Sequence, residues 1–216
     1  MTIWVNYAER ITDTFAYNKC ALLVVDVQTS FCSPNGRTAK KHANQKMQAV
    51  PERINSFVEI FKKQGGLPIY LKSTPDIESS NPIDKWINTL KGYNRPLTSM
   101  DPELDLYGLS LPDDALIIEK TGDGFSGSKL GSILKENNIE NVLVCGVRTE
   151  ICVRRVAERS STEGYRVFVL RDLCATRDDN DEHANQALMF INAYTGIVLE
   201  SKKMLNLLGD VDKSPS

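Results

Sequence analysis

Short apolar runs alternate with amphipathic segments along the chain. Residues 20–27, CALLVVDV, are apolar, β-branched and too short for a helix, which is typical of a strand buried on both faces. Residues 51–66 carry apolar side chains at helical spacing, begin with Pro51 in the first turn and end at two glycines, so they are predicted to form a helix. The same two patterns recur to the end of the chain.

Five more strands and three more helices are predicted from this alternation. The strands are LPIYLK, ALIIE, NVLVCG, YRVFVLRD and GIVLES, at residues 67–72, 115–119, 141–146, 165–172 and 196–201. The helices cover residues 128–137, 150–163 and 181–193. Strands joined by helical crossovers indicate an α/β fold in which helices cover both faces of a parallel sheet.

One segment departs from the alternation. Residues 74–112 are rich in Pro, Ser, Asn and Asp and show only a short helical pattern around Trp86. A connection of this length inside a compact domain is usually a lid or a binding loop, so we expect that role here. Residues 209–216, GDVDKSPS, have the composition of a frayed tail. With 41% hydrophobic content, the 216 residues are expected to form a single domain over 1–216.

Charge and composition narrow the classes of partner. The net charge is -2, the sequence pI is about 5.8, and acidic and basic residues are scattered, so neither nucleic acid nor a membrane surface is expected as a partner. The absence of a transmembrane stretch and of a signal-peptide pattern favours a cytoplasmic protein that binds a small molecule. The cysteines include no Cys-x-x-Cys pair, so reduced thiols are expected at Cys20, Cys32, Cys145, Cys152 and Cys174.

Three side chains with chemical potential follow predicted strands. In an open parallel sheet, ligands bind beyond the carboxyl ends of the strands. Asp26 closes the first strand, Lys120 follows the third, and Cys152 lies in the first turn of the helix after the fourth. Taken singly, they read as a turn residue, a solvated lysine and a core cysteine. Together, a helix N-terminus and an ammonium group would lower the pKa of the thiol below its usual value of about 8.5, and the carboxylate would accept its proton.

Three blocks of the sequence carry a resemblance to a known family. They are LLVVDVQTSF, with its Asp-x-Gln-x-x-Phe pattern, then IIEKTGDGFSGSKL, then VLVCGVRTEICVRRVAERSSTEGYRVFVLRDLCAT. In order and spacing these blocks resemble the signature blocks of the isochorismatase-like cysteine hydrolases, and the likeness continues from about Cys20 to Leu208. The resemblance implies a three-layer α/β/α, Rossmann-like fold with a doubly wound six-stranded parallel sheet of order 3-2-1-4-5-6.

The resemblance also implies the site and its chemistry. Its triad maps onto Asp26, Lys120 and Cys152, its oxyanion hole onto the backbone N–H groups of Arg148 and Cys152, and its non-proline cis peptide onto residues 147–148. A homo-oligomer is implied as well. We therefore expect hydrolysis of a small amide or carbamoyl C–N bond through a Cys152 thioester, with Asp26 as acid and base and Lys120 as charge partner.

Departures from the family pattern limit this expectation. Nicotinamidase-type members carry a metal site with an Asp-x-His element after the second strand, whereas YLKSTPDIESSNP contains no histidine, so neither a metal, another cofactor nor nicotinamide is expected. The enzymes that hydrolyse isochorismate itself lack the cysteine, so Cys152 favours amide over vinyl-ether hydrolysis. A catalytically retired interaction module and a thiol-based redox protein are the remaining alternatives.

Several further residues are assigned by position. Phe31 and Phe125 are expected to line the substrate pocket, and Arg148 either binds an anionic substrate group or pairs with Glu150. Cys32 lies near enough to Asp26 in sequence to touch the pocket, although a structural role is favoured. Core or structural roles are expected for Cys20, Cys145, Cys174 and His183, and a solvated position for His42.

Overall fold

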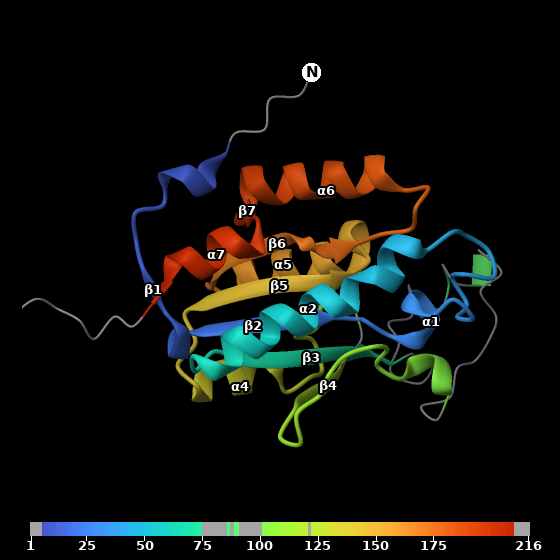
Figure 1. Ribbon diagram of the computed structural model, residues 1–216, viewed down its shortest axis with the longest axis horizontal. Helices are drawn as coiled ribbons and strands as arrows, with labels where there is room; N and C mark the ends of the chain where they lie inside the picture. The colour runs from blue at the N-terminus through green and yellow to red at the C-terminus, as the bar shows by residue number, and fades with distance from the viewer. Residues whose placement is uncertain (1–5, 75–85, 87–88, 91–100, 121, 210–216) are drawn as a thin grey trace, which may run out of the picture.

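A six-stranded parallel sheet forms the centre of the molecule (Figure 1). The computed structural model describes residues 6–74, 86, 89, 90, 101–120 and 122–209. The strands are β2 (Cys20–Val25), β3 (Leu67–Ser73), β4 (Leu116–Lys120), β5 (Asn141–Val147), β6 (Arg166–Ala175) and β7 (Ile197–Leu199). They lie in the order β4-β3-β2-β5-β6-β7. Counted along the chain from β2, this order is 3-2-1-4-5-6, which confirms the predicted doubly wound fold.

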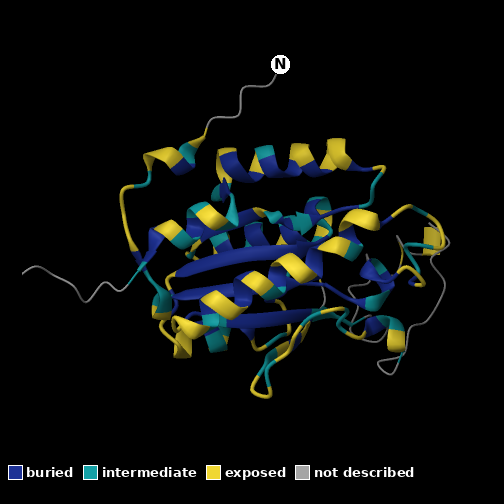
Figure 2. Ribbon diagram, viewed as in Figure 1, coloured by how far each residue is buried: buried dark blue, intermediate teal, exposed yellow. Residues whose placement is uncertain are grey.

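Helices cover both faces of the sheet and give three layers. The helices on one face are α2 (Gln45–Lys63) and α7 (Ser201–Leu207), and those on the other are α4 (Leu130–Glu136), α5 (Arg154–Thr162) and α6 (Asp181–Tyr194). Successive side chains of β2 alternate between the two cores, because Leu22 and Val24 pack toward α2 whereas Leu23 and Val25 pack toward the opposite layer. Every residue of β2 is buried (Figure 2), as its apolar run predicts.

The start of α2 differs from the prediction. The helix begins at Gln45, so Pro51 lies inside it and is buried, instead of occupying the first turn. The carboxylate of Asp178, far away in sequence, accepts hydrogen bonds from the backbone N–H groups of Gln45 and Lys46 at 2.9 and 3.0 Å. These N–H groups would otherwise lack partners at a helix start, so a distant residue extends the helix beyond its local signal.

The long connection 74–112 is described only in part. Trp86, Thr89 and Leu90 have helical backbone, in keeping with the helical pattern around Trp86, while residues 75–85, 87–88 and 91–100 lie outside the described residues. Its returning part contains η3 (Pro102–Leu104) and an isolated antiparallel bridge between Leu106 and Gln28. The role of this connection as a lid stays a prediction.

The two ends of the described chain meet in a second, smaller sheet. Strand β1 (Phe15–Ala16) pairs in parallel with β8 (Leu208–Gly209), which follows α7. Gly209, expected at the start of a frayed tail, therefore pairs with Ala16, and the remainder of that expected tail lies outside the described residues. A backbone pairing of two residues leaves too little sequence pattern to be predicted.

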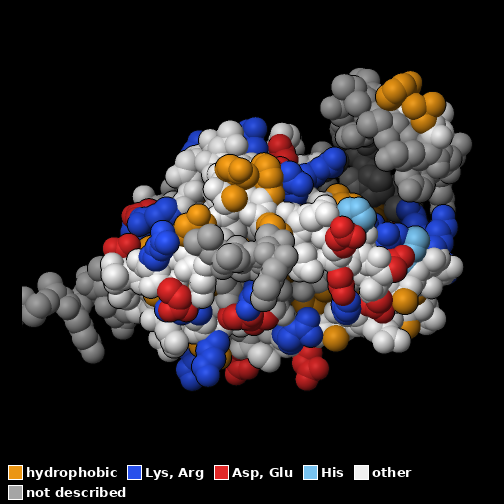
Figure 3. Space-filling view, turned by 90° about the horizontal axis from the view of Figure 1, so that it is seen from above, with side chains coloured by type: hydrophobic (Ala, Val, Ile, Leu, Met, Phe, Trp, Pro, Cys, Tyr) orange, Lys and Arg blue, Asp and Glu red, His pale blue; other side chains and the backbone are white. Residues whose placement is uncertain are grey.

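Charged side chains of both signs cover the surface. On the face shown in Figure 3, Lys and Arg side chains lie interspersed with Asp and Glu. Within the described ranges, the helices are too short or too polar to cross a bilayer.

Candidate active site

The carboxyl ends of the strands bring the three predicted residues to one edge of the sheet. Asp26 directly follows β2, Lys120 ends β4, and Cys152 lies in η4 (Thr149–Val153), the π-helical turn that follows β5. Strands β2 and β5 are neighbours at the point where the strand order reverses, and β3 lies between β2 and β4. The topology thus collects an acid, a cation and a thiol at the crevice where such sheets bind ligands.

Close packing of β5 against β2 requires a glycine next to Asp26. Gly146 pairs with Val25, and a Cβ atom at position 146 would lie 2.2 Å from the carbonyl oxygen of Val25. Asp26 itself has a left-handed backbone with φ of 52°, a conformation that Asp and Asn tolerate better than most residues. Its N–H donates to the Leu71 carbonyl at 2.9 Å. This turn ends the ladder and directs the chain away from the strand.

Asp26 and Lys120 form a buried ion pair. Lys120 Nζ donates a hydrogen bond to Asp26 Oδ2 at 3.0 Å. The other oxygen, Asp26 Oδ1, is buried and has no hydrogen-bond partner among the described residues. A buried charge is stable only when it is paired, so the two groups sustain each other's ionised forms. Asp26 Oδ1 is therefore free to accept a proton.

Cys152 lies beside this pair with its thiol protonated. Burial raises the pKa of the thiol, and the negative charge of Asp26 raises it further, whereas Lys120 and the backbone N–H of Arg148 lower it by smaller amounts. The expectation of a lowered pKa in the resting site is therefore wrong. The π-helical turn η4 runs directly into α5 (Arg154–Thr162), so Cys152 lies in the opening turn of this helical stretch, as predicted. The resting site holds a neutral thiol next to an ionised carboxylate.

The backbone and the side chain of Arg148 have different environments. The peptide bond between Val147 and Arg148 is cis, as the resemblance implied. The Arg148 side chain donates from Nε and Nη2 to Glu150 Oε1 at 2.8 and 2.6 Å, and Asn180 Nδ2 donates to the same oxygen at 2.8 Å. Of the two alternatives for Arg148, the structure shows the pairing with Glu150. Its backbone N–H stays the predicted oxyanion donor, together with that of Cys152.

The two expected pocket walls differ in position. Phe31 is half-buried in α1 (Thr29–Cys32), five residues after Asp26, and packs against the edge of the core on the α2 side of the sheet. Phe125 is buried in the opposite core, where its ring centroid lies 6.4 Å from that of Tyr165. Tyr165 directly precedes β6, and the expected pocket role of Phe125 stays a prediction.

The remaining cysteines are core residues. Burial raises the pKa of Cys20, Cys32 and Cys174 to about 12 and that of Cys145 also well above its ordinary value. Cys32 is fully buried in the core on the α2 side, which supports its structural assignment. These thiols should react more slowly than that of Cys152, whose proton can pass to Asp26.

The histidines contact other loops at the same edge of the sheet. His42 Nε2 lies 2.7 Å from Arg177 Nη1, and His183 Nδ1 lies 2.7 Å from Asn180 Oδ1, which agrees with a structural role for His183. Throughout the part of the chain that the structure describes, no three His, Cys, Asp or Glu side chains gather as metal ligands would.

Two further residues organise this edge. Gln28 is fully buried and its amide joins three backbone groups, and Glu150 accepts three hydrogen bonds on one oxygen. No role was predicted for Gln28, although the Asp-x-Gln spacing places it two residues after Asp26. Glu150 was predicted only as the alternative partner of Arg148, and its contact with Asn180, from another loop, has no local signal.

Comparison with known proteins shows the family of this chain. The model of the isochorismatase domain family matches residues 20–203. A nicotinamidase of Acinetobacter baylyi is 28% identical over 197 residues, covering 80% of this chain and 89% of the relative. A crystal structure of a cysteine hydrolase from Pseudomonas syringae pv. phaseolicola superimposes with a TM-score of 0.76 at 20% identity, covering 89% of this chain and 93% of the other.

An N-carbamoylsarcosine amidase from Thermoplasma acidophilum is likewise similar in structure. Its TM-score is 0.66 at 26% identity, and the match covers 85% of this chain and 96% of that one. The family match spans most of the chain, from the start of β2 to α7, and includes all three residues of the candidate triad. The chain therefore belongs to the isochorismatase family of hydrolases.

Proposed function

We propose that this protein is a cysteine hydrolase that cleaves the C–N bond of a small amide or carbamoyl compound. One observation carries the proposal. Asp26 holds one carboxylate oxygen against Lys120 and presents the other, buried and without a partner among the described residues, beside the neutral thiol of Cys152. A proton acceptor with a spare oxygen next to a protonated nucleophile is the arrangement that general-base activation of a thiol requires.

The first half of the reaction forms a thioester. Asp26 takes the thiol proton as the sulfur of Cys152 attacks the carbonyl carbon of the substrate. The carbonyl oxygen becomes an oxyanion, to which the backbone N–H groups of Arg148 and Cys152 donate. The C–N bond then breaks, and Asp26 returns the proton to the leaving nitrogen, so an amine or ammonia departs and the acyl group stays on sulfur.

The second half hydrolyses the thioester. Asp26, again ionised, accepts a proton from water while the water oxygen attacks the thioester carbonyl. Breakage of the C–S bond releases the acid, and the sulfur recovers the proton. Lys120 Nζ, 3.0 Å from Asp26 Oδ2, supplies the positive charge that balances the carboxylate in this buried site.

The relatives support an amide as substrate class. A nicotinamidase and an N-carbamoylsarcosine amidase both carry names of enzymes that act on amide or carbamoyl nitrogen. The cysteine at position 152 favours amide over vinyl-ether hydrolysis, and the contact of Lys120 with Asp26 beside Cys152 favours an active hydrolase over a retired interaction module. Nothing in this proposal requires a metal, another cofactor or a nucleic-acid partner. Assembly into a homo-oligomer stays a prediction.

A panel of small amides, ureas and carbamoyl compounds, scored for release of ammonia or amine, tests the proposal. Cys152→Ala should be inactive, and intact mass under substrate excess should show an acyl adduct on the wild-type protein alone. Cys174→Ala is the matched control, because Cys174 is another half-buried thiol at the same edge of the sheet and should keep full activity. A Cys152→Ala protein that retains near wild-type turnover would overturn the proposal, since no second nucleophile takes its place.

A further inference from the structure

Gln28 makes an unusual set of contacts for a side chain outside the triad. It is fully buried, its Nε2 donates to the carbonyl oxygens of Ser73 and Leu104 at 3.1 and 2.6 Å, and its Oε1 accepts from the N–H of Ser73 at 2.9 Å. Both amide hydrogens and one lone pair of the oxygen are thus engaged with main chain. The amide substitutes for a peptide group.

The location of Ser73 explains what this amide replaces. The paired residues of β2 and β3 end at Val25 and Leu71, because the chain turns away at Asp26. Ser73 lies two residues further and has no β2 residue opposite it in that register. Gln28 fills this gap by bonding both the N–H and the carbonyl of Ser73, so the side-chain amide extends the ladder past the end of the strand.

Ser73 is in turn paired with Lys120. The two residues are register partners in β3 and β4, and the Thr74 N–H donates to the Lys120 carbonyl at 3.0 Å. On the other side, the Gln28 N–H donates to the Asp26 carbonyl at 2.8 Å. A path therefore runs from the backbone of Asp26 through Gln28 to Ser73 by hydrogen bonds, and from Ser73 along the chain to Thr74, whose N–H bonds the backbone of Lys120.

This path matters because Asp26 and Lys120 come from strands that are not neighbours. Strand β3 separates β2 from β4, and the ion pair reaches across its carboxyl end. A shift of the β3 end would carry Lys120 with it and lengthen the 3.0 Å contact. The third hydrogen bond of the Gln28 amide, to the Leu104 carbonyl, also joins the last part of the 74–112 connection to Gln28.

We propose that Gln28 is a positioning residue that sets the separation of Asp26 and Lys120 by fixing the carboxyl end of β3. The proposal rests on the proposed function for its catalytic consequence, while its geometric consequence can be measured without a substrate. Asp26 acts electrostatically on Cys152 and on Cys32 and is paired with Lys120. Of Cys152, Cys32 and Lys120, only Lys120 is held in place through Ser73. Loss of the Gln28 amide should therefore weaken the effect of the Lys120 charge on Cys152 and leave the effect of Asp26 unchanged.

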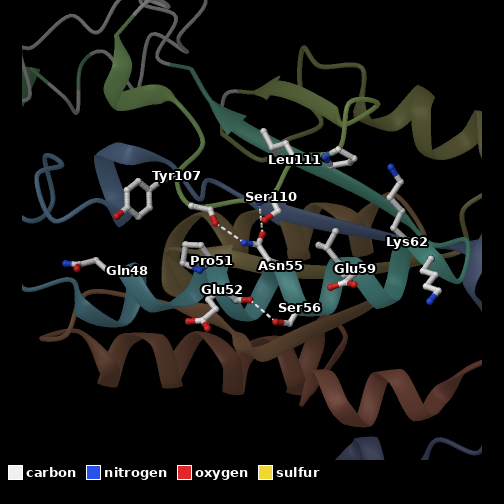
Figure 4. A pocket seen from close by; sticks show the side chains of 14 residues that line it. Gln48, Pro51, Glu52, Asn55, Ser56, Glu59, Lys62, Tyr107, Ser110 and Leu111 are labelled. Atoms are coloured by element: carbon white, nitrogen blue, oxygen red, sulfur yellow. Dashed lines mark hydrogen bonds between the residues drawn. The ribbon is translucent and has the colours of Figure 1, made fainter.

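The matched control is Asn55, shown in Figure 4. Its amide makes a similar two-way clasp further along the same connection, donating to the Gly108 carbonyl and accepting from the Ser110 N–H, both at 2.9 Å. Asn55 projects from the outer face of α2, and its clasp does not involve a strand end of the sheet. Asn55→Leu therefore removes an equivalent amide clasp without touching the path from Asp26 to Lys120.

The catalytic test compares Gln28→Met with Asn55→Leu. For Gln28→Met we expect kcat to fall about tenfold or more, with KM changed less, because Lys120 is no longer held at its distance from Asp26. Asn55→Leu should leave both within about twofold of wild type. A purely structural role for Gln28 would change melting temperature but leave kcat within about twofold of wild type.

A second measurement needs no turnover. Lys120 lowers the pKa of Cys152, so in Gln28→Met the alkylation of Cys152 by iodoacetamide at pH 9 should be at least about threefold slower than in wild type and in Asn55→Leu. Should Gln28→Met fail to fold, Gln28→Asn, which keeps a shorter amide, is judged by the same criteria. An unchanged alkylation rate and an unchanged kcat in the folded variant would overturn the positioning role. Failure of the proposed function would appear separately, as a wild-type protein that turns over no amide.

Discussion

Lys120 Nζ lies 3.0 Å from Asp26 Oδ2, and the side chains of the two residues expose only 1% and 0% of their surface. Neither charge can be compensated by water, so each depends on the other. The pair therefore links the stability of the protein to the activity that we propose for it.

Removal of one partner should destabilise more than removal of both. Asp26→Asn or Lys120→Met leaves an uncompensated buried charge and should each lower the free energy of unfolding by about 3 to 5 kcal/mol. The double variant should lose less than the sum of the two single losses. Urea unfolding of the four proteins measures this cycle, and additive losses would contradict the pairing. All three variants should be inactive.

The pH dependence of Cys152 labelling follows from its raised pKa. Because burial and the charge of Asp26 keep the thiol protonated, its rate of alkylation should rise steadily with pH and show no plateau near 9, the ordinary value for a cysteine. Asp26→Asn should accelerate labelling at pH 8, since it removes a charge that raises the pKa, and Lys120→Met should slow it. Peptide mapping reports the site. Labelling that is already maximal at pH 7 would contradict the neutral resting thiol.

The buried thiols should also limit stability at alkaline pH. The pKa of Cys20, Cys32 and Cys174 is raised to about 12 from 9.0, so the unfolded chain loses these protons first. Their stabilising contribution is complete below pH 9 and is lost as pH rises toward 12, at about 1.4 kcal/mol per pH unit for each thiol.

Urea unfolding at pH 8, 9 and 10 tests this decline. In Cys174→Ala the slope above pH 9 should be shallower than in wild type, because one titrating thiol is gone. Equal free energies of unfolding at pH 8 and pH 10 in the wild-type protein would show that these thiols do not titrate as their burial requires.

Chelation should leave turnover unchanged. The triad reaches its charge balance through Asp26 and Lys120 alone, and the second strand is followed by no histidine in YLKSTPDIESSNP. Dialysis against excess EDTA, followed by assay with and without added divalent ions, measures the effect. Activity that is lost on chelation and restored by one divalent ion would contradict a metal-free mechanism.

Most of the fold and the triad could be predicted because their signals are local. The apolar run of β2 predicts a strand that is buried on both faces, and the structure shows one. Asp26, Lys120 and Cys152 each lie at or after the end of an apolar run. Because the carboxyl ends of parallel strands lie at the same edge of a sheet, residues that follow different strands come together there.

What escaped prediction depends on contacts between distant segments. The pKa of Cys152 is raised first by burial and then by the charge of Asp26, which outweighs that of Lys120, and neither effect can be read from sequence spacing. The ring contact of Phe125 with Tyr165 joins two loops that are 40 residues apart, and its place after β4 does not reveal that contact. The pairing of Arg148 with Glu150 was one of two alternatives, but the contact of Glu150 with Asn180 from another loop has no local signal.

The cap on α2 makes the first turn of this helix depend on a distant segment. The N–H groups of Gln45 and Lys46 find their acceptor in Asp178, which is 133 and 132 residues away along the chain. Without that acceptor the local sequence favours a start at Pro51, where proline suits a first helical turn. Hydrogen exchange at Gln45 and Lys46 should therefore report the docking of the loop after β6 against α2.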